Sequence, residues 1–502
     1  MVLILPVIKL CAQVEKDSSS IHKQRGDNRN EISGQVIDNQ TRAALPYTNI
    51  YALKTGKGSI SNENGYFSID ISGLSGSDTV CFQYIGFKIR KMAINELGKD
   101  SVVGLDEEIY DLDEMLVFGD APDPREIVKN VIRNKSRNYP VYYCVRQSFI
   151  RQRENTDIDK FQLNVKKSTI PELDEATIKS LEAKIPKNTT SYTDFLGNVY
   201  FTGNPEDTLK LKIDPVRTVT LKEKEYDDLE QYDSLFNSIF TDTVEKEFWK
   251  VRSGIFGEKI DNIDEGSQTK EDSIRGDRWN TRGFSGRIRN ALVYSKLNDE
   301  DYWEFLYETG RYNYTIAGGT SFKGEEVFII DFSPRSGGHF TGRLYIAVST
   351  FALLRADYEY APGKIGRDIH LLGIGYTENS YSGSIYFERK DSCYALKYFS
   401  NKEGITATVD RNVEISKKRK RALFSRELMA LDLGLEIGIR SESSVEFYVL
   451  EEKKIDDGQY DDFTMPKYMD MIYVDQFDDS LWDGYPIIEP TRRMRDYRKQ
   501  GL

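Results

Sequence analysis

Residues 56–71 read GKGSISNENGYFSIDI, and this stretch decides the first part of the fold. Asn62, Asn64 and Gly65 are residue types that tolerate the positive φ angles of tight turns. In Tyr66–Ile71 the strongly apolar residues then recur at every second position, which places them on one face of an extended chain. The stretch predicts a β-turn that leads directly into a half-buried strand.

Similar alternation surrounds this strand, with turn-forming residues between the segments. Strands spaced by roughly 8–12 residues indicate a small antiparallel sandwich. The predicted strands are Ile32–Ile37, Thr48–Leu53, Tyr66–Ile71, Thr79–Tyr84 and Phe87–Met92. Gly34 inside the first strand permits either a close backbone approach or a bulge. Cys81 lies inside the fourth strand, where we expect it to be a small buried hydrophobic residue.

The spacing of several of these elements resembles the carboxypeptidase-regulatory-like domain. The elements are Gly34-x-Val36-x-Asp38, Pro46–Ile50, Gly58-x-x-Ser61-x-x-x-Gly65-x-Phe67-x-Ile69 and Val80-x-Phe82-x-Tyr84-Ile85-Gly86-Phe87. The resemblance covers residues 31–118 and implies a seven-stranded, transthyretin-like sandwich. Such domains stand at the N-termini of many Gram-negative envelope proteins, including TonB-dependent receptors.

The family name evokes a zinc peptidase, whose site needs converging His and carboxylate ligands with an open position for water. The chain has three histidines, His22, His339 and His370, and none has a Glu at the H-x-x-E or H-E-x-x-H spacing. We therefore expect the accessory domain without the catalytic one, and no metal, cofactor or catalytic residue. His339 and His370 are predicted to be loop or strand residues, with metal ligation as the alternative.

The N-terminus MVLILPVIKLCAQ predicts a signal peptide over residues 1–12, cleaved after Ala12. The alternative is a lipoprotein signal in which Cys11 carries the lipid. Residues 13–30 are polar and aperiodic, which predicts a flexible tether. The chain is therefore expected in the periplasm or at the outer-membrane periphery of a Gram-negative bacterium. Its remaining cysteines, Cys81, Cys144 and Cys393, are odd in number and widely spaced, which argues against a disulfide framework or a zinc site.

The composition favours a folded, β-rich chain of two or three domains. The 502 residues are 39% hydrophobic and include 31 Tyr and 25 Phe, which pack well on sheets. The net charge of −12 argues against nucleic acid as a partner. One local cluster, here the basic cluster, is positively charged despite the negative net charge. It is formed by Lys417, Lys418, Arg419, Lys420 and Arg421. We interpret this cluster as a solvated loop or strand end, with contact to anionic lipid head groups as the alternative.

Residues 119–288 predict a mixed segment that contains helices. Asp123 is a helix cap, Pro124 fits the first helical position and Glu126 is a capping-box partner, so a helix should run from here to Tyr139-Pro140. A strand is expected next. The further predictions are a strand at Val141–Gln147 and helices at Glu172–Lys184 and Tyr226–Trp249.

Residues 289–502 predict an antiparallel meander with a C-terminal tail, in which Trp482 packs on the sheet. The fold class is thus mainly β with some α: an N-terminal β-sandwich, then a large curved antiparallel sheet or partial barrel with capping helices. The predicted strands are Leu292–Tyr294, Trp303–Tyr307, Tyr312–Ala317, Glu326–Pro334, Phe340–Ala347, Ala352–Tyr360, Ile369–Thr377, Gly383–Glu388, Cys393–Ser400 and Val445–Glu451.

Residues 324–360 are similar to the hairpins of periplasmic lipoprotein carriers and of uncharacterised envelope proteins that join such a sheet to the regulatory-like sandwich. The carriers hold acyl chains in the concavity of a half-open barrel capped by helices. The resemblance implies that the large sheet binds a lipid, a lipoprotein or an envelope partner.

Two functional hypotheses follow. The first is a non-catalytic envelope binding or scaffold protein. The second is an envelope hydrolase of glycans or peptides with an accessory sandwich, which needs two carboxylates across a cleft. Acidic pairs such as Asp106–Glu108, Asp461–Asp462 and Asp478–Asp479 are expected by chance among 81 acidic residues. The acidic segment Asp111–Glu114 could bind Ca²⁺ but lacks the EF-hand spacing. No nucleophile elbow, phosphate loop or dinucleotide fingerprint occurs in the sequence, so we prefer the first hypothesis.

Overall fold

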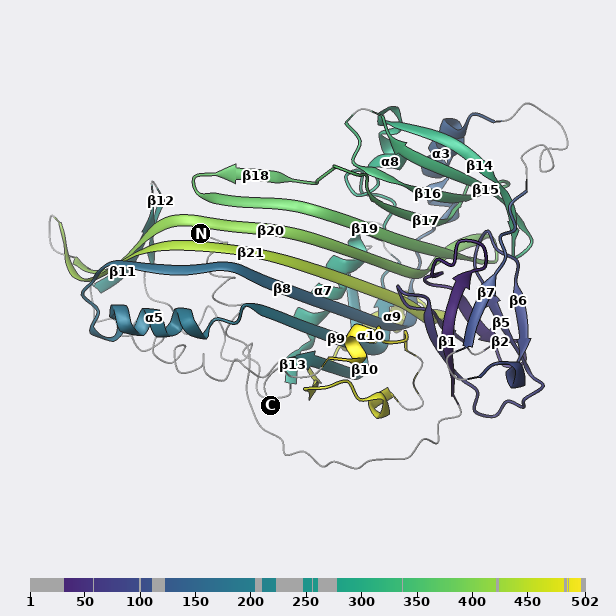
Figure 1. Ribbon diagram of the computed structural model, residues 1–502, viewed down its shortest axis with the longest axis horizontal. Coiled ribbons are helices and arrows are strands. Elements are labelled where there is room, and N and C mark those ends of the chain that lie inside the picture. The colour runs from purple at the N-terminus through teal and green to yellow at the C-terminus, as the bar shows by residue number, and fades with distance from the viewer. Residues whose placement is uncertain are drawn as a thin grey trace.

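The computed structural model contains a small β-sandwich and one large sheet (Figure 1). It describes residues 31–56, 58–98, 101–110, 122–203, 210–222, 247–254, 256–260, 278–335, 337–420, 424–482, 485 and 487–497. The predicted signal peptide with Cys11, the tether, Asp111–Glu114 and Arg421 lie outside the described residues.

The N-terminal sandwich has seven strands in two sheets, which confirms the architecture expected from the resemblance. The sheet orders are β4-β1-β7 and β3-β2-β5-β6. The strands are β1 (Glu31–Asp38), β2 (Asn49–Ala52), β3 (Gly58–Ile60), β4 (Tyr66–Asp70), β5 (Thr79–Gln83), β6 (Arg90–Ala93) and β7 (Ser101–Leu105), with a short helix η1 (Ile94–Glu96) before β7. The expectation of purely antiparallel pairing was wrong in one place, because β1 pairs with β7 in parallel.

The turn at residues 62–65 depends on one glycine and one asparagine side chain. Of the three predicted turn residues, Gly65 alone has a positive φ, at +75°. Asn62 Oδ1 instead accepts hydrogen bonds from the backbone N–H groups of Asn64 and Tyr66, at 2.9 and 3.0 Å. Gly34 provides a close approach, since a Cβ there would lie 2.3 Å from the Ser101 carbonyl oxygen. Phe67 and Cys81 are fully buried, as expected.

The large sheet contains fourteen described strands. Its main path runs β14-β15-β16-β17-β19-β20-β21-β8-β9-β10-β23, with β11, β12 and β18 attached to it. The strands are β8 (Cys144–Ser168), β9 (Asn188–Phe201), β10 (Leu211–Lys222), β11 (Glu247–Ser253), β12 (Phe256–Ile260), β14 (Tyr312–Phe322), β15 (Glu325–Pro334), β16 (Phe340–Ala347), β17 (Leu353–Tyr360), β18 (Asp368–Leu371), β19 (Ile374–Lys390), β20 (Cys393–Lys420), β21 (Ser425–Lys454) and β23 (Ile472–Val474). The described strands form an open, curved sheet whose long strands run along the molecule (Figure 1).

Pairing in this sheet is antiparallel apart from β10 with β23. Strands β8, β9 and β10 lie in its middle and towards one edge, although they come from the segment that the sequence assigned to residues 119–288. The large sheet therefore contains strands from both sides of the predicted domain boundary at residue 288. β20 and β21 pair over almost their entire lengths of 28 and 30 residues, far beyond the short segments that alternation had indicated.

The first helix begins as predicted. In α3 (Pro124–Arg133) the Asp123 side chain accepts from the Arg125 N–H at 2.9 Å, with Pro124 in the first turn. Glu126 does not complete a capping box; its carboxylate binds Lys129 and Arg133. The other described helices are α4 (Lys135–Asn138), η2 (Pro171–Leu173), α5 (Glu175–Lys184), α7 (Thr281–Val293), α8 (Glu304–Tyr307), η4 (Thr309–Arg311), α9 (Asp457–Asp462), η5 (Asp479–Trp482) and α10 (Arg492–Arg495). A two-stranded sheet joins β13 (Arg278–Asn280) to β22 (Tyr468–Asp470).

Three sequence predictions were wrong. Leu292 and Val293 end helix α7 and Glu304–Tyr307 forms α8, although both segments were expected to be strands. Short apolar runs do not distinguish a strand from a helix that is buried on one side, and here the helices pack on the sheet. Phe248 and Trp249 belong to β11 rather than to a helix. The rest of that predicted helix, residues 223–246, lies outside the described part of the chain.

One face of the large sheet is filled by these helices. Ile127 and Val128 of α3, Ile288 of α7 and Phe305 of α8 join a continuous apolar cluster with inward residues of the strands, such as Leu344. Each of these side chains is at most 2% exposed. This face is therefore a packed core, and the opposite face of the sheet carries the sandwich.

Candidate functional site

The face that carries the sandwich is organised in rows that cross the strands, because directly paired residues point to the same side of a sheet. The first row, here the aromatic row, is Tyr345, Arg355, Tyr386, Tyr398, Tyr448 and Phe149. The second, the inner polar row, is Thr315, Asp331, Arg343, Asp357, Ser384, Ser400, Glu446, Arg151 and Asp194. The third, the outer polar row, is Thr341, Glu359, Ser382, Lys402, Ser444, Arg153 and Tyr192.

The sandwich docks on the aromatic row. Tyr47 stacks on Tyr398 with ring centroids 4.2 Å apart, and the Arg355 guanidinium lies 4.2 Å from the centroid of the Tyr84 ring. The backbones of Tyr110 and Gly319 exchange two hydrogen bonds of 2.8 and 3.0 Å. These contacts hold one edge of the sandwich against the sheet.

The C-terminal tail covers the aromatic row at Phe149. Trp482 packs edge-on against Phe149 at 5.5 Å and is 5% exposed, which confirms its predicted role. The tail is tied to the sandwich by Asn62, which donates from Nδ2 to the Glu489 carbonyl oxygen at 3.0 Å. It is tied to the sheet by Arg151, which donates to the Ile488 carbonyl oxygen at 3.0 Å.

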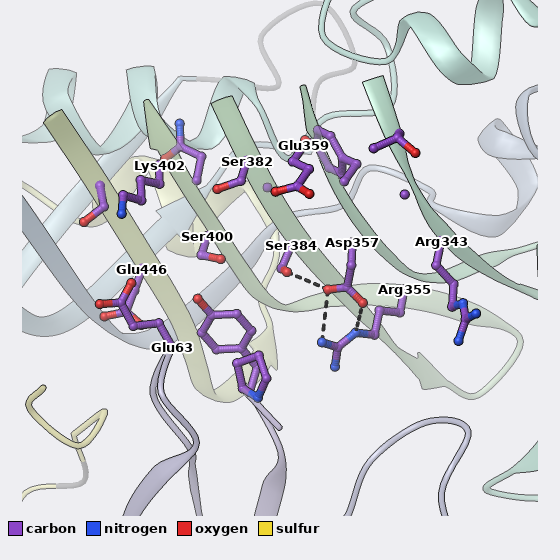
Figure 2. Close-up of a pocket in the computed structure, with 18 of the residues that line it drawn as sticks. Glu63, Arg343, Arg355, Asp357, Glu359, Ser382, Ser384, Ser400, Lys402 and Glu446 are labelled. Carbon is purple, nitrogen blue, oxygen red and sulfur yellow. Dashed lines mark hydrogen bonds and ion pairs between the residues drawn. The ribbon is translucent and has the colours of Figure 1, made fainter. Parts of the chain in front are cut away.

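A cavity of about 770 Å³ lies over the two polar rows; we call it the polar pocket (Figure 2). Its floor is the sheet, and its walls come from Pro46, Tyr47, Glu63 and Tyr84 of the sandwich and Thr491 of the tail. Small hydroxyl residues make up the centre of the floor, namely Ser382, Ser384, Ser400 and Ser444. Their short side chains leave room above the sheet, and this volume falls within the range of ligand sites.

Most charges on the pocket floor are paired with one another. Arg355 makes two hydrogen bonds to Asp357, at 2.7 and 3.0 Å, and Ser384 Oγ donates to the same carboxylate at 2.5 Å (Figure 2). The arginine at the far side of the pocket, Arg343, binds Asp331 in the same bidentate manner. Such forked pairs fix the positions of both side chains.

Two further cations of the floor share one carboxylate. Arg153 and Lys402 lie 2.6 and 3.1 Å from Glu442. Arg151 is buried, makes two 2.8 Å hydrogen bonds to Asp194 and donates to backbone carbonyl oxygens of the tail. Its guanidinium also lies 5.2 Å from the centroid of the Phe149 ring. The cations of the pocket floor therefore form ion pairs with carboxylates of the protein itself.

Three carboxylates of the pocket form no ion pair with any described residue: Glu63, Glu359 and Glu446. Glu446 is 9% exposed, and its Oε1 is buried with no hydrogen-bond partner among the described residues. Burial raises the pKa of Glu446 to about 7, and the nearby Arg151 partly opposes that shift. Figure 2 shows Glu446 and Glu63 beside each other at one end of the pocket.

A second, smaller cavity of about 330 Å³ lies on the helix side of the sheet, lined in part by Cys144, Arg146 and Lys296. Burial lowers the pKa of Lys296 to about 8, with a contribution from the positive charge of Arg146. The lining is otherwise largely apolar, with Leu292, Leu297 and Phe387 among its residues.

The basic cluster lies at the end of β20, far along the sheet from the polar pocket. Lys417 and Arg419 both contact Glu247 of β11, at 3.3 and 2.5 Å, and Lys418 lies 3.7 Å from Glu427. Arg419 is still 53% exposed at its side chain. Part of the positive charge is therefore matched within the protein, and contact with anionic lipid stays a prediction.

His339 and His370 are loop and strand residues, as predicted. His339 sits in the loop before β16 with Nδ1 2.8 Å from Glu304, and His370 lies in β18 beside Asp368. Cys81, Cys144 and Cys393 are free thiols in buried positions. Within the described residues no group of three or more His, Cys, Asp or Glu side chains gathers as a metal site.

None of the pocket residues had been predicted from the sequence as a site. Their local signal is weak: the alternation of Ser382 and Ser384 with Gly383 on β19 indicates only a polar strand face. The acidic pairs singled out from the sequence do not line the pocket.

The comparisons with known proteins bear on the sandwich. Residues 32–117 match the family model of the CarboxypepD_reg-like domain, which confirms the resemblance expected from the sequence. The comparison with curated proteins finds no match.

Solved structures similar to this chain include the following three. A candidate outer membrane lipoprotein-sorting protein domain from Vibrio parahaemolyticus is 8% identical, with a TM-score of 0.21, 67% of this chain and 97% of that chain covered. The MucA/MucB complex of Pseudomonas aeruginosa gives 8% identity, a TM-score of 0.16, and 70% and 99% coverage. A DUF1329 family protein from Desulfovibrio piger is 11% identical, with a TM-score of 0.17, and the match covers 68% of this chain and 98% of that chain. With TM-scores this low, these neighbours carry no inference about binding or reaction. Among the described residues, no helix is both long and apolar enough to cross a membrane.

Proposed function

We propose that this chain is an exported, non-catalytic binding protein of a Gram-negative cell envelope, located in the periplasm or at the outer-membrane periphery. The observation that carries the proposal is the polar pocket of about 770 Å³, which neither the sandwich nor the sheet forms alone. The sandwich contributes a wall through Tyr47, Glu63 and Tyr84, so its role is to complete a binding site. The regulatory-like family match supports an accessory role for this domain.

Among the candidate ligands, an envelope protein fits the polar pocket better than an acyl chain. An acyl chain would leave the hydroxyl, amide and charged side chains of the floor without hydrogen-bond partners. The apolar face of the sheet is occupied by α3, α7 and α8. Lipid or lipoprotein contact is therefore proposed only for exposed surfaces, such as the basic cluster with Arg419 and Lys420.

The test is native mass spectrometry of the protein isolated from its own envelope fraction. We expect a species to co-purify with the wild type and to be lost in Ser382→Trp, which fills the centre of the pocket. Ser380→Trp serves as the control, because Ser380 is an exposed residue of the same strand outside the pocket. Finding the same species on both variants, or the protein outside the envelope fraction, would contradict the proposal.

A hydrolase of envelope glycans or peptides is the second candidate, and Glu446 favours it. A buried carboxyl with a pKa of about 7 can hold a proton for general-acid work, and Glu63 lies near it as a second carboxylate. Incubation with peptidoglycan fragments and with casein tests this candidate. Release of products that is abolished in Glu446→Gln would favour the hydrolase over the binding protein.

A further inference from the structure

The charges of the polar pocket are unbalanced once its internal pairs are removed. The arginines of the floor are bound to Asp331, Asp357, Asp194 and Glu442, and Lys402 shares Glu442 with Arg153, while Glu63, Glu359 and Glu446 form no ion pair with a described residue. In this state the pocket can offer carboxylate oxygens to a ligand, whereas its arginines are already occupied by carboxylates of the protein. It is therefore complementary to a positively charged group.

Glu446 is a pocket carboxylate that a hydrogen-bond donor from a ligand would stabilise. It is 91% buried, and its Oε1 lacks a hydrogen-bond donor among the described residues. Its cross-strand neighbour Arg151 does not satisfy it, because the Arg151 guanidinium is held by Asp194 and the tail. A buried carboxylate oxygen without a donor is costly, and a donor from a ligand would lower that cost.

The shape of the site suits a linear polymer. The inner polar row crosses nine neighbouring strands from β14 to β9, and residues of these strands line the pocket. Eight inter-strand spacings of ~4.8 Å give a long axis of ~38 Å along the sheet, about the length of eleven residues of extended peptide.

The aromatic rings near the described part of the pocket are largely occupied by other side chains, which favours a peptide over a glycan. Carbohydrate sites stack sugars on exposed rings, but the sandwich covers the aromatic row at Tyr398 and the tail covers it at Phe149. Tyr398 and Tyr448 are 1% and 4% exposed, and the Tyr84 ring is occupied by Arg355. What the pocket offers instead is hydroxyl, amide and carboxylate groups, which match peptide N–H groups and basic side chains.

From these observations we propose that the polar pocket binds an extended segment of a partner protein and that Glu446 receives a lysine or arginine side chain of that segment. This inference rests on the proposed function, since it takes the polar pocket as the binding site. Ser382, Ser384 and Ser400 lie along the same floor and would contact the segment on either side of the basic residue.

The test uses blocked nine-residue Gly/Ser peptides with one central lysine, one central arginine or one central acetyl-lysine, titrated into the full chain by calorimetry. The lysine and arginine peptides should bind at least ~10-fold more tightly than the acetyl-lysine peptide, as expected for a charge-assisted contact. Glu446→Gln should weaken binding of the lysine peptide by the same factor. Glu451→Gln is the matched control, because Glu451 is an exposed residue of the same strand outside the pocket.

The pH dependence provides a second readout. The groups that act on Glu446 are Arg151 of β8, Asp194 of β9, Tyr398 of β20 and Glu63 of the sandwich. Affinity for the lysine peptide should rise between about pH 6 and pH 8 as Glu446 ionises, while the lysine stays charged. The Glu446→Gln variant should lose this rise.

The inference is overturned if acetyl-lysine binds as tightly as lysine, if Glu446→Gln leaves the affinity unchanged, or if oligomers of N-acetylglucosamine bind and the peptides do not. Its failure is distinguishable from failure of the proposed function. A neutral species that co-purifies from the envelope and is displaced by Ser382→Trp would refute the cationic peptide while leaving the binding protein intact.

Discussion

Tyr47 of the sandwich stacks on Tyr398 of β20, with ring centroids 4.2 Å apart and an interplanar angle of 28°. The two rings join parts of the chain that lie some 350 positions apart in the sequence, at the base of the polar pocket. Because Tyr47 also lines the pocket, the same contact that docks the sandwich shapes the candidate binding site.

Replacing Tyr47 by alanine should loosen the sandwich from the sheet. The loss of ring burial and stacking should cost about 1–3 kcal/mol of docking free energy. Hydrogen exchange should therefore accelerate at Leu45–Thr48 and at Tyr398–Ser400, with little change in the sandwich core at Phe67. Tyr66→Ala is the control, because Tyr66 is 40% exposed on the outer face of β4. Equal exchange in both variants would show that the stack does not hold the two parts together.

Replacing Asn62 by alanine should weaken both the turn and the tail. The fully buried side chain accepts from two backbone N–H groups and donates to the Glu489 carbonyl. Loss of these bonds should cost about 2–3 kcal/mol in the free energy of unfolding. Urea denaturation measures the total, and protease sensitivity at residues 487–497 reports the tail. Asn64→Ala should cost much less, since Asn64 is exposed and takes part in the turn through its backbone N–H and carbonyl groups.

Breaking the buried pair of Arg151 and Asp194 should be strongly destabilising. Both side chains are at most 4% exposed and make two 2.8 Å hydrogen bonds. Asp194→Asn or Arg151→Met should each lower the free energy of unfolding by about 3–5 kcal/mol, because each leaves the other charge buried. The double variant should cost less than the sum of the two. Asp159→Asn breaks the exposed pair with Arg440 and should leave the stability nearly unchanged, because solvent screens such a pair.

Glu446→Gln should stabilise the protein, and only at neutral and higher pH. The folded pKa of about 7 lies above the ordinary value of 4.5, so ionisation opposes folding. The free-energy cost of ionising Glu446 in the folded protein is absent below about pH 4.5 and grows through pH 7. At higher pH it is constant, at on the order of 3 kcal/mol. Urea denaturation at about pH 8 should show the gain and denaturation at about pH 5 should show little of it. A gain of equal size at both pH values, or one also seen in Glu451→Gln, would contradict this explanation.

The parts of the fold that the sequence predicted well depend on neighbouring residues. The alternation in Tyr66–Ile71, the turn glycine Gly65 and the capping pair Asp123-Pro124 each act within a few positions of the chain. Short apolar runs at Leu292–Tyr294 and Trp303–Tyr307 were misread, because their helical form is stabilised by packing on the sheet rather than by local periodicity.

The candidate site depended on register between distant strands. Glu446 lies opposite Arg151, Ser400 opposite Ser384, and Asp357 opposite Arg343, and none of these pairs can be read from sequence spacing. A shift of one residue in any strand would turn its polar residues to the core face. The sequence by itself determined a sandwich, a helix start and a set of alternating strands, because those signals are local. Only the tertiary structure decided that the sandwich closes a polar pocket over the sheet and leaves Oε1 of Glu446 buried without a hydrogen-bond donor among the described residues, because pairing and domain docking bring together residues hundreds of positions apart.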